Sequence, residues 1–247
     1  SSRLLEADNI VAVLGHQGAA VRKVLPEGTL IAIQEQQLGT GHAVKVALEQ
    51  LNSSDSMVLV LFGDVPLVTP QTLQKLVTES QGYSVSVLTA IVPDPRGLGR
   101  IIRDQNGELK KIVEAADATE KELAIREINS GIMAIRKEDL IRWLPKLEPA
   151  NNQGELYLTD IIELAIEESS TVQAIVCEDP DEATGINSPL ELAQAERILQ
   201  KRRVKDLVME GLRVADMSRL DIRGEVQIGK DCFIDVNVVL EGNVKIG

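Results

Sequence analysis

Aromatic and positively charged residues are scarce in this sequence. Phe, Trp and Tyr make up 2% of its 247 residues, and 26 Lys and Arg stand against 38 Asp and Glu, which gives a net charge of −12. A polyphosphate backbone is repelled by such a chain, and nucleic acid bases find few rings to stack on. We therefore expect no nucleic acid partner, whereas a single nucleotide stays compatible because a divalent cation can supply local positive charge.

Long apolar runs and clusters of metal-binding side chains are also missing. No run approaches the length of a bilayer span, and residues 1–8 do not resemble a secretory signal, so we expect a cytoplasmic protein without a membrane partner. The two cysteines, Cys177 and Cys232, have no Cys or His neighbours at zinc spacing, which favours buried thiols over metal ligands.

Short apolar runs alternate with helical patterns over the first 92 residues. The runs cover residues 10–14, 29–33, 57–62 and 84–92, and the helical patterns lie at 18–25, 42–51 and 70–80. This alternation predicts βαβ units and a mostly parallel sheet. The length allows one substantial α/β domain with an appendage.

The middle of the chain adds a hairpin. Alternating residues at 99–103 and 109–114 flank Asn106-Gly107, a strong hairpin signal. A strand at 127–135, helices at 137–144 and 154–168, and a strand at 172–176 are predicted next, followed by a charged helix over residues 189–210 that begins with Pro189 and ends at Gly211.

The last part of the chain has a period of six residues. Ile222, Ile228, Ile234, Leu240 and Ile246 recur at that spacing. The pattern predicts the start of a left-handed parallel β-helix, with a pair of hairpins as the alternative. Since about three hexapeptides make one coil and such folds need several stacked coils, we expect a chain that is cut short.

Two glycines and a threonine join a predicted strand to a predicted helix. Gly39-Thr40-Gly41 lets the backbone approach a flat polar ring, which its main-chain groups can then recognise. A strand–helix turn without a ligand is the alternative interpretation.

Asp64 follows the next apolar run, just past the carboxyl end of the predicted strand. Ligands of open α/β sheets bind there, so Asp64 is a candidate for metal or phosphate chemistry, or else a turn cap. Asn187 and Ser188 precede the long helix and are candidate N-caps. Asn187 also carries an oxygen that suits Mg²⁺, which typically takes one or two protein oxygens.

Glu114 and Asn129 are predicted at neighbouring strands of the central region. Presented side by side, they would offer an acceptor and a donor to sugar hydroxyls, although either could be a structural polar residue. Tyr157, Thr159 and Asp160 are interpreted as helix cap and core residues.

Several motifs together resemble one enzyme family in order and spacing. It is the bacterial bifunctional N-acetylglucosamine-1-phosphate uridyltransferase and glucosamine-1-phosphate acetyltransferase, and the resemblance covers essentially the whole chain. The motifs are Gln34 with Leu38-Gly39-Thr40-Gly41-His42-Ala43, Phe62-Gly63-Asp64-Val65-Pro66, Gly97-Leu98-Gly99-Arg100-Ile101, Ile112-Val113-Glu114, Glu127-Ile128-Asn129-Ser130-Gly131, Gly154-Glu155-Leu156-Tyr157-Leu158-Thr159-Asp160 and Gly185-Ile186-Asn187.

The resemblance implies a fold and a reaction. The fold is a Rossmann-like α/β nucleotidyltransferase domain with a mixed sheet over residues 1–188, a linker helix over 189–211 and the start of a β-helix over 212–247. The reaction joins UTP and N-acetylglucosamine 1-phosphate into UDP-N-acetylglucosamine and pyrophosphate, with Mg²⁺, in peptidoglycan precursor synthesis. The parent protein would also be an acetyltransferase and a homotrimer built on the β-helix.

The resemblance also implies roles for individual residues. Gln34, Gly39 and Thr40 would bind the uridine, and Phe62 and Gly63 would lie along the nucleotide. Asp64 and Asn187 would hold Mg²⁺. The N-acetylglucosamine would be faced by Gly99, Glu114 and Asn129.

The chain departs from the family pattern in three respects. The family opens with a strand and a glycine-rich loop that carries an Arg and then a Lys, and Ser1 lies beyond this point. Many relatives have Lys where this chain has Ala116, and the sequence ends before the acetyl-CoA site. We therefore expect the chain as written to be inactive, and a sugar-nucleotide-binding regulatory or scaffold module without turnover is the alternative function.

Overall fold

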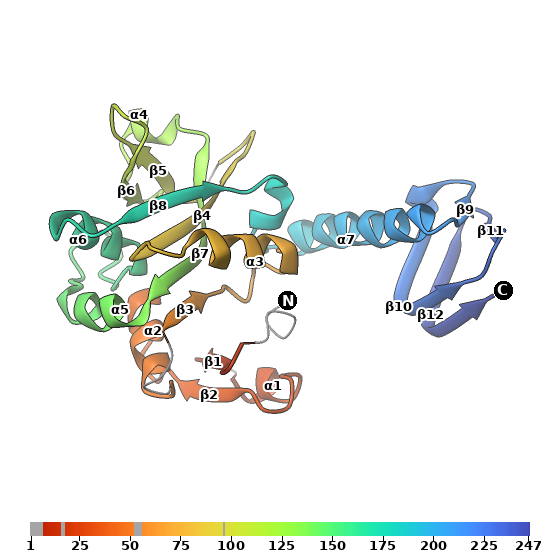
Figure 1. Cartoon of the computed structure of the whole chain (residues 1–247), viewed down its shortest axis with the longest axis horizontal. Helices are drawn as coiled ribbons and strands as arrows, with labels where there is room; N and C mark the ends of the chain where they lie inside the picture. Colours follow the sequence, from red (N-terminus) through yellow and green to blue (C-terminus); the bar gives the residue numbers. More distant parts are fainter. Residues whose placement is uncertain (1–6, 16–17, 52–55, 96) are drawn as a thin grey trace. The chain divides into compact units, whose positions relative to one another are not determined.

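The structure is a computed structural model that describes residues 7–15, 18–51, 56–95 and 97–247 (Figure 1). The chain divides into two compact units, Ser1–Thr184 and Gly185–Gly247. Among the described residues, no helix combines the length and apolar character needed to cross a bilayer.

The first unit is built on a mixed six-stranded sheet, as the family resemblance implies. β4 and β8 pair in parallel, whereas the remaining pairs are antiparallel. The sheet order is β6 (Leu109–Val113), β5 (Arg100–Arg103), β7 (Glu127–Arg136), β4 (Val85–Ile91) and β8 (Val172–Val176), with β3 (Met57–Val60) paired to β7.

Successive side chains of β7 point to opposite faces of the sheet, and each face is covered by its own hydrophobic core. Ile128 and Ile132 join one core with Leu73 and Leu76 of α3 (Pro70–Glu79). Met133 and Ile135 join the other core, which includes residues of α5 (Lys137–Trp143) and α6 (Ile161–Glu167). The long strand β7 is therefore the centre of the unit.

A smaller sheet pairs β1 (Val11–Leu14) with β2 (Leu30–Ile33) in parallel. In the chain, α1 (Gly18–Arg22) follows β1 and α2 (Thr40–Leu48) follows β2. Within the described residues, β3 pairs with β7 and not with β1 or β2, so the predicted mostly parallel sheet is wrong for β3. Apolar patterning identifies a strand, but its partner depends on residues far away in the sequence.

Local signals account for several element boundaries. The hairpin turns at Gly107, and α3 begins at Pro70 after Thr69, whose hydroxyl accepts a hydrogen bond from Thr72 N. α7 (Pro189–Met209) begins after Ser188, which accepts from Glu191 N, so Ser188 is the N-cap. Cys177 is buried as expected, whereas Cys232 is partly exposed.

The second unit contains α7 and two pairs of parallel strands. β10 (Leu220–Ile228) pairs with β12 (Val238–Ile246) at an offset of 18 residues, which places Ile222 opposite Leu240. β9 (Arg213–Val214) pairs with β11 (Phe233–Ile234). Parallel pairing contradicts the alternative of two hairpins and fits three six-residue repeats per coil. A complete left-handed β-helix stays a prediction.

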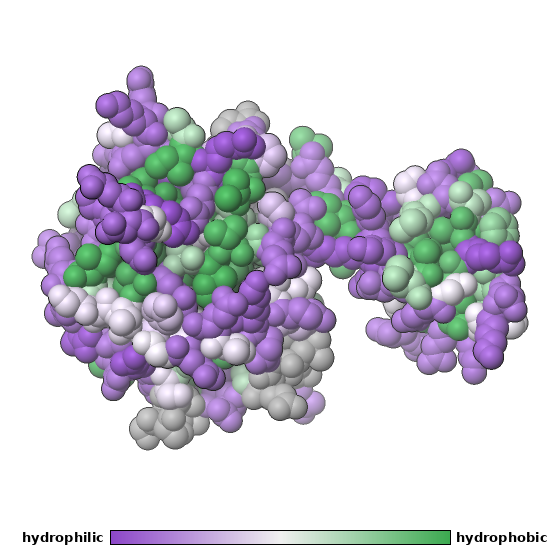
Figure 2. Space-filling model, turned by 45° about the horizontal axis from the view of Figure 1, so that its top comes forward, coloured by the Kyte–Doolittle hydropathy of each residue, from purple (hydrophilic) through white to green (hydrophobic). Residues whose placement is uncertain are grey.

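A buried amide holds α7 against this coil. Gln200 donates from Nε2 to Ile222 O at 2.9 Å and accepts from Ile222 N at 2.6 Å. The core around it includes Val204, Leu220 and Ile234. Apolar side chains also gather on the face of this unit that Figure 2 shows in green.

We expect Ile135→Ala to destabilise the first unit by about 2–5 kcal/mol, because Ile135 is fully buried in β7 and its truncation leaves a cavity. Ile141→Ala on α5, where the side chain is 54% exposed, is the matched control and should change stability by less than about 0.5 kcal/mol. Urea unfolding followed by circular dichroism measures both. Equal losses in the two variants would contradict the assignment of this core.

Candidate functional site

The loop before α2 is held by the backbone of Leu156. Leu156 N donates to Leu38 O and Gly41 N donates to Leu156 O, both at 2.8 Å. Gly39 has a φ of 104°, and a Cβ there would lie 2.6 Å from Leu156 O. Glycine is therefore required at this position by the fold itself, in addition to any ligand that the loop binds.

Gln34 and Thr40 are tied into the same loop. Gln34 Nε2 donates to Gly39 O at 3.1 Å and lies 3.0 Å from His42 Nδ1. Thr40 Oγ1 accepts from Leu158 N at 2.9 Å. The structure thus brings Gln34, Gly39 and Thr40 together, and their role in uridine binding stays a prediction.

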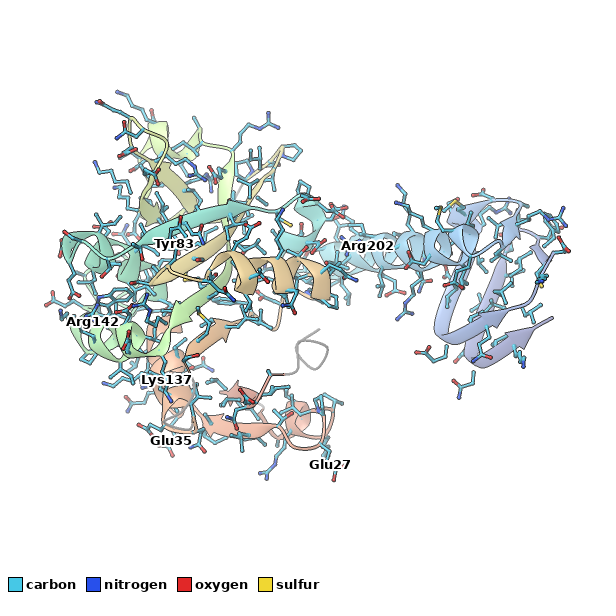
Figure 3. All side chains as sticks on the ribbon, viewed as in Figure 1. Glu27, Glu35, Tyr83, Lys137, Arg142 and Arg202 are labelled. Atoms are coloured by element: carbon cyan, nitrogen blue, oxygen red, sulfur yellow. The ribbon has the colours of Figure 1, made fainter. Side chains whose placement is uncertain are left out.

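An open pocket of about 420 Å³ adjoins this loop. Its lining residues come from the ends of β1 and β2 and the chain that follows β2: Gly15, Ile33, Gln34, Glu35 and Gln37. Glu35 is labelled in Figure 3, just beyond β2. Polar groups of Gln34 and its neighbours therefore border a space that a small ligand could enter.

Gly99, Glu114 and Asn129 form a second cluster. Asn129 N donates to Gly99 O at 2.9 Å, and a Cβ on Gly99 would lie 3.1 Å from Glu114 Oε2. Glu114 is half-buried, and this burial raises the pKa of its carboxyl group, while a hydrogen bond from Thr159 acts in the opposite direction. The three residues predicted to face a sugar are therefore neighbours.

Phe62 extends this cluster to the chain that follows β3. Asn129 Oδ1 accepts from Gly131 N at 2.9 Å, and a Cβ on Gly131 would lie 2.7 Å from the Phe62 ring. Gly131 has a φ of 81°, which together with the ring contact requires glycine there. The Phe62 ring therefore lies beside Gly131, which follows Asn129 by two residues in β7.

Gly63 and Asp64 follow Phe62 on an exposed turn. A Cβ on Gly63 would meet nothing within 4 Å, and its φ is not positive. Asp64 has no hydrogen-bond partner among the described residues, so its carboxylate oxygens are available to a cation. Asn187 belongs to the second unit, where its N–H donates to Glu191 Oε2, and its pairing with Asp64 stays a prediction.

The predicted helix over residues 154–168 is wrong at its start. A 3₁₀ turn covers Leu158–Asp160, α6 begins at Ile161, and residues 154–157 are not helical. The reason is that Leu156 directs its N–H and C=O to the loop before α2 instead of to a helix.

Thr159 contacts a candidate site residue, and the sequence does not predict this contact. Thr159 is buried, as its interpretation as a core residue requires, and its hydroxyl also donates to Glu114 Oε1 at 3.2 Å. Tyr157 is buried, and Asp160 makes no side-chain cap to α6. The sequence signal for Thr159 itself is its position within the motif from Gly154 to Asp160, one of those that resemble the enzyme family.

Arg100 follows Gly99 but is turned into the fold. Its side chain is buried and donates to the carbonyl oxygens of Leu98 and Leu123, the latter at the end of α4 (Glu120–Leu123). Its Nε has no partner within the described residues. A guanidinium held in this way fixes the turn before β5 and is not exposed to a bound phosphate.

Carboxylates gather beside Glu114. Burial raises the pKa of Asp160 to about 6, and the negative charges of Glu163, Glu114 and Asp117 add to the effect. Burial also raises the pKa of Tyr157, again with a contribution from Asp117 and Glu114. This side of the site is therefore unfavourable for phosphate groups and compatible with neutral hydroxyls.

Known proteins match the chain along its length. One family model, described as the MobA-like NTP transferase domain, matches residues 1–145. Proteins named bifunctional protein GlmU are 46% identical in Paraburkholderia phytofirmans and 42% identical in Acinetobacter baumannii; each match covers 100% of this chain and 54% of the relative. The chain thus spans about half the length of these curated relatives.

Two solved structures share the fold. A nucleoside-diphosphate-sugar pyrophosphorylase from Vibrio cholerae has a TM-score of 0.57 at 14% identity, covering 78% of this chain and 82% of its own. HddC from Yersinia pseudotuberculosis has a TM-score of 0.53 at 16% identity, covering 78% and 80%. At these identities the likeness concerns the fold alone, and it confirms the predicted mixed α/β architecture.

We expect Gly39→Ala to lower the stability of the first unit by roughly 1–3 kcal/mol or more, because the positive φ and the contact with Leu156 O must both be relieved. Gly63→Ala is the control and should change stability by less than about 0.5 kcal/mol, since its Cβ enters open space. Thermal unfolding compares the two variants. A tolerated Gly39→Ala would show that the loop is not held as described.

We expect Asp160→Asn to stabilise the protein at neutral pH but not in acid. The pKa of Asp160 is raised from 3.8 to about 6 in the folded state, so the stabilisation from its protonation is complete below 3.8 and lost as pH rises through 6. Because the side chain is partly exposed, screening reduces the gain to about 1 kcal/mol. Urea unfolding at roughly pH 7.5 and pH 3.5 measures it. A gain of the same size at both pH values would contradict this account.

Proposed function

Because this chain belongs to the MobA-like NTP transferase domain family, we propose that its first unit transfers a uridylyl group from UTP to N-acetylglucosamine 1-phosphate. The products are UDP-N-acetylglucosamine and pyrophosphate. Relatives named bifunctional GlmU that match the whole chain support this choice of reaction. The acetyltransferase activity, the trimer and a cytoplasmic location belong to the proposal for the whole protein.

The observation that carries the proposal is the contact between Gly99, Glu114, Asn129 and Phe62. These residues come from three separate segments, yet Gly99 bonds Asn129 and lies beside Glu114, and the Phe62 ring lies beside Gly131, whose N–H donates to Asn129. The cluster offers a carboxylate acceptor on Glu114 and an amide donor on Asn129, because Asn129 Oδ1 is engaged by Gly131 N and its Nδ2 has no partner among the described residues. Such a set suits the hydroxyl and acetamido groups of a sugar.

The reaction needs alignment more than a protein nucleophile. An oxygen of the sugar phosphate attacks the α-phosphorus of UTP, the new P–O bond forms, and the bond from the α-phosphorus to the bridging oxygen breaks as pyrophosphate leaves. In our proposal Gln34, Gly39 and Thr40 orient the uridine, while Glu114 and Asn129 hold the sugar. The two substrates would then meet beside Phe62 and Gly63.

Gly63 supports the placement of the nucleotide. Neither backbone conformation nor packing requires glycine at this position in the described structure. A side chain at position 63 would project into the open space beside the turn. We infer that the nucleotide passes close to this backbone, as glycine permits.

In our proposal Asp64 of the first unit would hold Mg²⁺. Its carboxylate is a hard oxygen ligand and is exposed without a protein partner in the described part of the chain. A role of Asn187, which belongs to the second unit, rests on the resemblance alone. Mg²⁺ typically takes only one or two protein oxygens and completes its shell with water and phosphate, so a single carboxylate is compatible with such a site. When bound, Mg²⁺ supplies neutralisation of phosphate charge.

Pyrophosphate release tests the proposal in a chain extended at its N-terminus by the opening strand and glycine-rich loop of its relatives. With UTP and Mg²⁺ we expect release with N-acetylglucosamine 1-phosphate and much less with other sugar 1-phosphates. Asp64→Asn should lower the rate by a factor of about 10³, on the scale of a lost metal contribution, without loss of folding.

Glu148→Gln removes another exposed carboxylate and is the matched control, for which we expect an unchanged rate. Preference for a different sugar phosphate would overturn the choice of substrate. Binding of UDP-N-acetylglucosamine with no turnover would favour the regulatory or scaffold module. Full activity of Asp64→Asn at saturating Mg²⁺ would remove Asp64 from the metal site.

A further inference from the structure

An ion pair joins the β5–β6 hairpin to β7 next to the candidate sugar site. Arg103 Nε lies 2.8 Å from Glu127 Oε2, and its second terminal nitrogen lies 2.6 Å from Glu127 Oε1. The side chains are 30% and 14% exposed. This bidentate geometry fixes both the distance and the orientation of the guanidinium relative to the carboxylate.

The hairpin and β7 carry different parts of the site. Gly99 and Glu114 stand at the two ends of the hairpin, whereas Asn129 belongs to β7. Backbone pairing between these parts is short: Arg100 lies opposite Ile128, and Asn129 N donates to Gly99 O. The relative position of Glu114 and Asn129 therefore depends on few backbone contacts.

Arg103 and Glu127 provide a second connection beside that short pairing. Glu127 lies two residues before Asn129, so both side chains leave β7 on the same face. Arg103 also donates to Gly107 O in the hairpin turn at 2.8 Å. One guanidinium thus links the turn of the hairpin to the strand that bears Asn129.

Thr89 of β4 completes this connection. Its hydroxyl donates to Glu127 Oε1 at 2.8 Å, and in the strand register Thr89 lies opposite Asn129. Burial acts to raise the pKa of Glu127, but the hydrogen bonds from Arg103 and Thr89 lower it below its ordinary value. The carboxylate therefore stays ionised and paired at neutral pH.

We propose that Arg103 and Glu127 are positioning residues that hold Glu114 and Asn129 at the spacing needed to bind the sugar. The proposal rests on the proposed function, which assigns the sugar to this cluster. Loss of the pair should weaken the use of the sugar phosphate and leave the use of UTP unchanged, because the hydrogen bonds that hold the loop before α2 come from Leu156 and Leu158, and not from Arg103 or Glu127.

Three variants of the extended chain test the proposal by steady-state kinetics. Arg103→Lys keeps the positive charge but cannot form the bidentate pair, and Arg103→Met removes the charge. Glu127→Gln removes the negative charge but keeps the shape of the side chain and the oxygen that accepts from Thr89. We expect the KM for N-acetylglucosamine 1-phosphate to rise about tenfold in Arg103→Met and Glu127→Gln and less in Arg103→Lys, with the KM for UTP changed by less than about threefold.

Lys75→Gln is the matched control, because it breaks an exposed ion pair with Glu178, also at 2.8 Å, away from the hairpin. It should change neither KM. A parallel rise of both KM values in the Arg103 and Glu127 variants, or a fall in melting temperature with both KM values unchanged, would overturn the proposal.

Hydrogen exchange gives a readout that does not depend on turnover. The N–H of Asn129 is bonded to Gly99 O, so we expect it to exchange at least tenfold faster in Glu127→Gln than in the wild type, while the N–H of Leu156 is unaffected. Unchanged exchange at Asn129 would overturn the positioning role whether or not the enzyme is active. If the extended chain without any substitution releases no pyrophosphate, the proposed function fails separately.

Discussion

The candidate site depends on one stretch of backbone before α6, Leu156–Thr159. Leu156 bonds Leu38 and Gly41 through its two peptide groups, Leu158 N donates to Thr40, and Thr159 donates to Glu114. Four hydrogen bonds over four residues thus connect the loop proposed for the uridine with the carboxylate proposed for the sugar. If this stretch continued α6 by one more turn, the C=O of Leu156 would accept a hydrogen bond within the helix, and its bond with Gly41 N would be lost.

Local patterns in the sequence were sufficient for much of the fold. Apolar runs predicted the strands of the mixed sheet, Asn106-Gly107 predicted the hairpin, and the period of six predicted the parallel register in which Ile222 faces Leu240. Capping chemistry narrowed the start of α7 to two candidates, of which Ser188 is the cap. These features arise from interactions between residues close in the sequence or from strict repeats.

The errors concern contacts between distant residues. Nothing near Gly154 indicates that Leu156 must pair with a loop more than a hundred residues earlier, and no pattern in β3 indicates antiparallel pairing with β7. The residues of the site were proposed from the resemblance, but the contacts among them, such as Thr159 with Glu114, come from the structure. The roles of these residues in binding stay predictions.

The fold requires glycine at positions 39 and 131 but does not require it at position 63. The first two combine a positive φ with a crowded Cβ position, whereas Gly63 faces open space. In a library of substitutions, selection for folded protein alone would retain glycine at the first two positions and accept many residues at Gly63. Selection for turnover would restrict all three, so the difference between the two screens would separate glycines that maintain the backbone from one that makes room for a ligand.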